Sequence, residues 1–195
     1  MPLPTTIFQY LTPAMTMRLM LMALLLLFWL WSPGIAAERG WCDYRQEAPA
    51  ESAMRANLPR WVCNFATDHT LQKQYEPSFH LNPFFILGDF DGDHQTDAAI
   101  LVRNVATGQI GIAVIHRTAK RIFVLGAGRS MNNGGPDFAW MDNWTLYPKG
   151  AVKQSPWEKH TLRLRGDALW VAKAESASAL LYWNGRDYAW YQESD

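Results

Sequence analysis

The sequence predicts an α+β domain, built mainly from antiparallel β-sheet with one or two short N-terminal helices. Short β-branched or aromatic runs recur through the second half of the chain, and glycine, asparagine and aspartate separate them. The one helix-favouring segment lies near the start of the domain. Strands that follow one another across short turns pair most simply as antiparallel hairpins. The residues after position 37 are numerous enough for one domain with its own core.

The first 37 residues have the pattern of a secretory signal peptide. Arg18 is their one charged side chain, an apolar run over residues 19–31 follows, and Ala36 and Ala37 end the segment. The run has 13 residues, whereas a membrane-spanning helix needs about 20, so cleavage after Ala37 is preferred to a permanent anchor. We expect residues 1–37 to be a signal peptide and residues 38–195 to form one exported domain, periplasmic or secreted, that contacts the membrane only before cleavage.

The exported part is nearly neutral and contains both cysteines. Removing residues 1–37 removes Arg18 and leaves a net charge of −1, so no basic surplus indicates a nucleic-acid partner. Cys42 and Cys63 would meet an oxidising compartment, and we expect a disulfide between them. It would close a loop of about 20 residues and stabilise the fold by about 3 kcal/mol in the chain-entropy estimate. Two buried thiols are the alternative.

The expected elements follow in chain order. Residues 47–58 favour a helix that ends at Pro59, and residues 60–82 have no clear pattern. Apolar, β-branched or aromatic runs predict strands at residues 84–87, 98–102, 110–115, 121–125, 161–165, 168–172, 179–183 and 188–191. The last two strands flank Asn184-Gly185, a strong hairpin signal. Residues 126–137 are so rich in glycine and asparagine that we expect a loop.

An acidic loop, residues 89–97, lies between two predicted strands. It carries four carboxylates, those of Asp89, Asp91, Asp93 and Asp97. Calcium takes about six to eight oxygen ligands, and alternating aspartates on a tightly turning chain can converge on one ion. Gly92 gives the backbone room to turn, and Gln95 would add its main-chain carbonyl. We therefore expect one calcium ion in the loop. An acidic turn without metal and a catalytic metal site are the alternatives.

The segment resembles the Asp-x-Asp-Gly-Asp-x-x-x-Asp calcium loop of FG-GAP and VCBS-type repeats, over residues 84–103. The whole chain is similar to small exported bacterial proteins that carry a single such loop. The resemblance implies calcium binding by the four aspartate side chains and the Gln95 main chain. Those repeats have glycine where this chain has His94, and a positive φ there is less favourable, though histidine tolerates it. Propellers carry many such units, so their adhesive roles are not implied.

A second candidate site follows the glycine-rich loop. One candidate is a polar and aromatic groove, of the kind that binds carbohydrates or peptides, which Arg129, Asn132, Asp137, Trp140, Asp142 and Trp144 would form. A long connection whose tryptophans fill the core is the alternative. Neither zinc-ligand spacing nor a serine-nucleophile motif occurs. We therefore prefer a binding or structural role, with an envelope or extracellular partner. The alternative is a hydrolase with Asp137 and Asp142 as acid and base.

Overall fold

The computed structural model describes residues 40–42, 54–69 and 71–194. The chain separates into two compact units, Met1–Ala37 and Glu38–Asp195. The first unit, with the expected signal peptide, lies outside the described residues, as do residues 47–53 of the expected helix; residues 54–56 are helical. Within the described part of the chain, no helix is both long and apolar enough to cross a bilayer.

The first sheet of the Glu38–Asp195 unit has five antiparallel strands. They are β1 (Tyr75–Pro77), β2 (Phe85–Gly88), β3 (Asp97–Asn104), β4 (Ile110–His116) and β5 (Arg121–Gly126). The order is β1-β3-β4-β5, and β2 also pairs with β3. Because β1 pairs with residues 102–104 and β2 with residues 97–100, the two short strands share one edge of β3.

The second sheet is a four-stranded antiparallel meander. It consists of β6 (Asn143–Tyr147), β7 (Ala168–Lys173), β8 (Ala177–Trp183) and β9 (Tyr188–Ser194), in that order. In the β8–β9 hairpin, Trp183 pairs with Tyr188. Asn184 shapes the turn, because its side-chain oxygen accepts bonds from the N–H groups of Arg186 and Asp187. This confirms the predicted hairpin.

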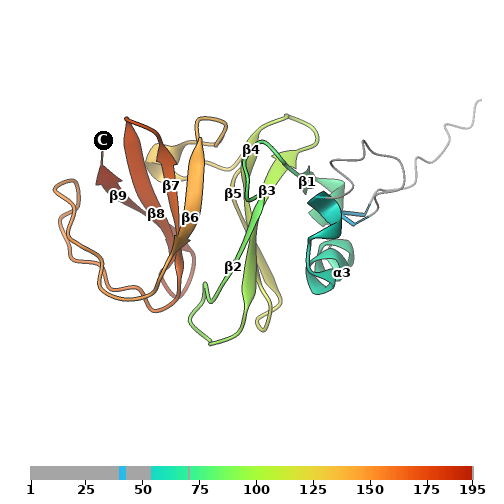
Figure 1. The fold of residues 1–195 in the computed structure, drawn as a ribbon, viewed down its shortest axis with the longest axis horizontal. Helices are drawn as coiled ribbons and strands as arrows, with labels where there is room; N and C mark the ends of the chain where they lie inside the picture. Colours follow the sequence, from blue (N-terminus) through green and yellow to red (C-terminus); the bar gives the residue numbers. More distant parts are fainter. Residues whose placement is uncertain (1–39, 43–53, 70, 195) are drawn as a thin grey trace, which may run out of the picture. The chain divides into compact units, whose positions relative to one another are not determined.

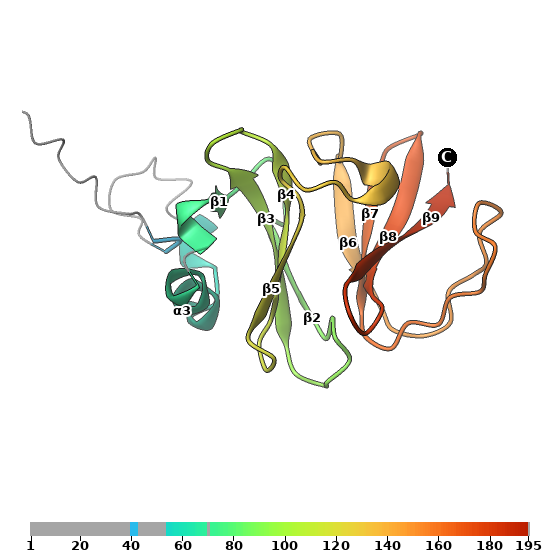
Figure 2. The same cartoon turned by 180° about the vertical axis from the view of Figure 1, so that it is seen from behind.

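The first sheet is covered on both faces. Residues 97–102 of β3 and 111–116 of β4 are buried without a break, as expected for a strand with packing on both sides. One core joins β3 and β4 to Val62 of helix α3 (Arg60–Asp68) and to Leu181 of the second sheet. Figures 1 and 2 show α3 on one side of this sheet and β6–β9 on the other. The layers are therefore helix, sheet and sheet.

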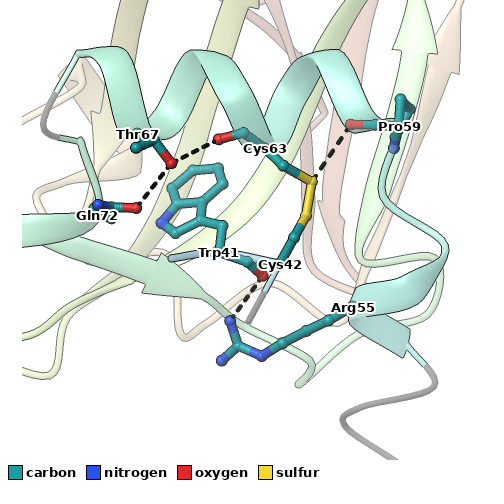
Figure 3. Close-up of a disulfide and its surroundings, with 7 residues drawn as sticks. All are labelled: Trp41, Cys42, Arg55, Pro59, Cys63, Thr67 and Gln72. Carbon is teal, nitrogen blue, oxygen red and sulfur yellow. Dashed lines mark hydrogen bonds between the residues drawn. A yellow bond between two sulfur atoms is a disulfide. The ribbon is translucent and has the colours of Figure 1, made fainter. Parts of the chain in front are cut away.

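A disulfide joins the N-terminal segment to α3. Cys42 and Cys63 are bonded, with their Cα atoms 5.7 Å apart, which confirms the predicted pair. Figure 3 shows Trp41 beside this bond. The Trp41 indole is buried, and its Nε1–H donates to the Tyr75 carbonyl at 2.8 Å. The crosslink and this hydrogen bond thus hold the start of the domain against α3 and β1.

The predicted β-rich fold is confirmed, but the sequence pattern predicts one strand wrongly and misses three elements. Residues 161–165 are not a strand: Arg163 makes only an isolated bridge to Ala151, within the long connection between β6 and β7. The patterns also miss α3, β1 and β6. In β6 the alternation is real but short, since buried Trp144 is flanked by exposed residues. The inward face of α3 is narrow, with Val62 and Ala66 as its buried residues.

Candidate functional site

The acidic loop connects β2 to β3, and Gly88 pairs with Asp97 at its base. Phe90, fully buried, anchors the loop in the core. Gly92 and His94 have positive φ, 80° and 68°, so His94 adopts a conformation that glycine adopts more readily. Gly92 is also required by space, because a Cβ there would lie 2.9 Å from the Arg165 carbonyl oxygen.

Three carboxylates of the loop converge. Asp89, Asp91 and Asp93 each offer one oxygen, and these oxygens lie within 4.8 Å of one another. Each carboxylate also accepts a bond from a loop N–H: Asp89 from His94 at 3.2 Å, Asp91 from Asp93 at 3.1 Å and Asp93 from Gln95 at 2.8 Å. These local turns hold three negative charges close together, where a cation can reach all three.

The negative charges of the loop carboxylates repel one another. Burial raises the pKa of Asp91, and the neighbouring Asp93 and Asp89 carboxylates act in the same direction. The pKa of Asp93 is lowered, mainly by the hydrogen bond from the Gln95 N–H. A cation among these oxygens would relieve the repulsion and favour the ionised form of each carboxylate.

Asp97 holds the acidic loop through hydrogen bonds on its buried side. It is fully buried; one carboxylate oxygen accepts from the N–H groups of Phe90 and Asp91, and the other from Arg117 at 2.9 Å. Burial raises its pKa to about 6. Asp97 groups with Asp91 and His116, whose ligand atoms lie within 4.8 Å of one another. Of the five predicted ligands, three carboxylates therefore form one cluster, and Asp97 joins them through Asp91.

His116, at the end of β4, was not predicted as part of this site. It is 1% exposed; its Nδ1 lies 3.5 Å from an Asp91 oxygen, and its Nε2 is hydrogen-bonded to the Tyr188 hydroxyl at 2.8 Å. Burial lowers the pKa of His116 to about 4, and the Arg121 charge acts in the same direction. The ring is therefore neutral at pH 7 and links the acidic loop to β9 by polar contacts.

Two residues of the connection between β6 and β7 hold the other side of the loop. Lys149 Nζ lies 3.0 Å from an Asp89 carboxylate oxygen. The Asp167 carboxylate accepts from the backbone N–H groups of Asp89 and Lys149, and the Asp167 N–H donates to the Asp89 carbonyl at 2.6 Å. Gly166 packs so closely that a Cβ would lie 2.6 Å from that carbonyl oxygen. The acidic loop is thus tied to the second sheet.

No local signal in the sequence identifies these partners. Asp167 is 78 positions from Asp89, and Lys149 is 60. The residues of the acidic loop are recognisable because they are consecutive, whereas the groups that position them arrive through the packing of the second sheet on the first.

The donor set suits a hard divalent cation. Carboxylate oxygens are the ligands that calcium and magnesium prefer, and Asp89, Asp91 and Asp93 present three of them together. Lys149 is the nearest competing positive charge among the contacts described. The cluster can therefore bind a cation, and Asp97 adjoins it through Asp91.

The residues of the predicted groove do not gather in one place. Trp144 is buried, 2% exposed, and donates from Nε1 to the Pro83 carbonyl. Asp137 accepts from the N–H groups of Ile110 and Ala139, and both oxygens of Asp142 accept from the Ala174 N–H. Asn132 begins the 3-10 helix η2 (Asn132–Gly134), and Arg129 lines a cavity beside β5.

Trp140 alone of these six residues lines a larger hollow, here called the aromatic groove. Its volume is about 530 Å³. It is bounded by Asn133, Gly134, Trp140, Trp157, Glu158, Lys173, Ser176, Ala177, Trp190 and Gln192. The expectation of an aromatic groove near the glycine-rich loop thus has a counterpart, with Trp157 and Trp190 in place of Trp144.

Comparisons of the chain with protein-family models, with curated proteins and with solved structures gave no match.

Proposed function

We propose that the acidic loop binds one calcium ion and that this ion stabilises an exported α+β domain with a binding or structural role. The convergence of Asp89, Asp91 and Asp93 within 4.8 Å carries the proposal. In the proposed site these side chains, the Gln95 main-chain carbonyl and Asp97 supply the protein oxygens. Calcium is preferred to magnesium because its coordination is larger and more flexible.

A structural effect is expected because the acidic loop touches both sheets. It begins and ends on strands of the first sheet, and Asp167 bonds it to the connection that precedes β7. Neutralising its charges would therefore strengthen a contact between the sheets as well as the loop itself.

Export is proposed from two features. The first is the pattern of Arg18, the apolar run over residues 19–31 and the small residues at 36 and 37. The second is the Cys42–Cys63 disulfide, typical of oxidising compartments. The proposed location is periplasmic or extracellular, with an envelope or extracellular partner.

Thermal unfolding of the full chain tests the metal site. Calcium at about 100 times its Kd stabilises by roughly 2.7 kcal/mol, which raises the Tm by about 5 to 10 °C relative to chelator. Magnesium should have a smaller effect. Asp91→Asn should abolish the calcium shift yet leave the Tm in chelator unchanged or higher, because it removes a charge that burial and two neighbours disfavour.

Asp68→Asn is the matched control, because Asp68 is exposed at the end of α3, away from the acidic loop. It should retain the full calcium shift. Equal melting curves in calcium and chelator, or a shift that Asp91→Asn preserves, would contradict the proposal.

A further inference from the structure

Three indole rings line the aromatic groove, and they come from three separate segments. Trp140 follows η2, Trp157 belongs to the connection between β6 and β7, and Trp190 lies in β9. The end of β7 and the turn to β8 complete the wall with Lys173 and Ser176. A volume of about 530 Å³ lies within the range of small-molecule sites, roughly 300–1,000 Å³.

Two of the rings are fixed before any ligand arrives. Trp140 donates from Nε1 to the Gly134 carbonyl at 3.0 Å, and Trp190 donates from Nε1 to the Gln192 side-chain oxygen at 2.7 Å. The two rings meet edge to face, with centroids 6.3 Å apart. Since both N–H groups already have protein partners, these indoles offer a ligand mainly apolar ring surface.

The third ring is held open to solvent. Trp157 is 55% exposed. Its backbone is fixed, because its N–H donates to the Ser155 hydroxyl at 3.1 Å. A single exposed tryptophan is ordinary; one that faces a hollow with two further indoles provides a third stacking surface at a defined position.

The charges on the wall balance. Glu158 contributes one negative charge and Lys173 one positive charge, and the other wall residues are uncharged. Glu158 is also engaged, because its carboxylate accepts from the Gln192 backbone N–H at 2.9 Å. A strongly anionic or cationic ligand would therefore find no net attraction, and the groove suits a neutral one.

Two main-chain groups beside the groove are already hydrogen-bonded. β9 is the edge strand of the second sheet, and such an edge can pair with an extended peptide. Here the Gln192 N–H is bonded to Glu158, and the Glu193 carbonyl accepts from the Ser155 hydroxyl at 3.1 Å. An extended peptide cannot pair with β9 at these two positions without displacing those bonds, which disfavours strand addition there.

We infer that the aromatic groove binds a neutral oligosaccharide. The C–H groups on the face of a sugar ring carry partial positive charge and stack on the negative face of an indole. Hydroxyl groups at the ring edge match the polar side chains of Asn133, Lys173 and Ser176 at the wall. The inference rests on the proposed binding role, which it makes specific, and does not require the calcium ion.

The test uses the full chain on an array of defined neutral and charged glycans, followed by titration of the strongest neutral trisaccharide by tryptophan fluorescence. We expect saturable binding, and Trp157→Ala should raise the Kd roughly five- to tenfold. Trp157→Phe keeps a ring and should retain most of the affinity. Trp61→Ala is the matched control, because Trp61 lies on α3 against Arg117, outside the groove.

Melting curves of the variants verify that each is folded, and Trp157 is exposed enough for its removal to be tolerated. Absence of binding to every neutral glycan, affinity that Trp157→Ala leaves unchanged, or capture of a peptide in place of a glycan would overturn the inference. If calcium does not raise the Tm but the glycan still binds, only the proposed metal site is overturned. Chromatography that detects cleavage of the bound glycan would overturn the non-catalytic role.

Discussion

The carboxylates of the acidic loop come from nine consecutive residues, whereas the indoles of the aromatic groove span 50 positions, from Trp140 to Trp190. The loop carboxylates are brought together by hydrogen bonds between near neighbours. The indoles are brought together by the packing of η2, β9 and a long connection. A substitution of a loop carboxylate should therefore act locally on metal binding, and a substitution among the tryptophans should act according to burial.

The largest expected effect is a difference in folding stability between two tryptophan variants. Trp144→Ala should destabilise the fold by about 3–5 kcal/mol, because Trp144 is 2% exposed and its indole is bonded to the Pro83 carbonyl. Trp157→Ala should change stability by about 0.5 kcal/mol or less, because Trp157 is 55% exposed. Urea unfolding of both variants measures the difference. Similar losses of stability in the two variants would contradict the assignment of Trp144 to the core and of Trp157 to an exposed groove wall.

The next effect tests the contact between the acidic loop and the second sheet. Gly92→Ala should destabilise by about 2–4 kcal/mol, since it combines an unfavourable φ with a clash against the Arg165 carbonyl. Gly108→Ala is the matched control: its φ is 76°, close to the 80° of Gly92, but a Cβ there meets nothing within 4 Å. It should cost about 1 kcal/mol. Chemical unfolding that gives equal losses would contradict the importance of the close approach.

The smallest expected effect is on calcium affinity, and it comes from the positive charge of Lys149. Lys149→Met should lower the calcium Kd about two- to fivefold, because Lys149 Nζ lies 3.0 Å from an Asp89 oxygen and competes for it. The effect is modest because the Lys149 side chain is 42% exposed and solvent screens the pair. Calorimetric titration at low and high salt measures it, and the gain should shrink as salt rises. Lys153→Met, exposed in the same connection, should leave the Kd unchanged.

Most of the strands were predictable because their signals are local, and the disulfide was predictable because the signal pattern implies an oxidising compartment for both cysteines. Runs such as residues 110–115 can hardly form anything but a buried strand, and the asparagine and glycine at 184 and 185 match the turn that joins β8 to β9. Residues 161–165 show the limit of this reasoning. They alternate in character like a strand, but only Arg163 finds a partner, and an unpaired alternating segment cannot form a sheet.

The groove residues show a second limit. Asp137, Asp142 and Trp144 lie close to Trp140 in sequence, yet the aspartates accept backbone hydrogen bonds and Trp144 enters the core. Trp157 and Trp190, which are distant in sequence, take their place beside Trp140. Proximity along the chain indicates a shared surface only when the segment has a regular period, and residues 138–144 have none.

The sequence by itself determined most of the antiparallel strands, the turn at Asn184 and the carboxylates of the acidic loop, because each depends on residues close together in the chain. Tertiary structure alone decided that Lys149 and Asp167 meet Asp89, that His116 joins Asp91 to Tyr188, and that three distant indoles share one groove. The physical reason is that these contacts form only when the second sheet buries its face against the first, and burial depends on the whole chain.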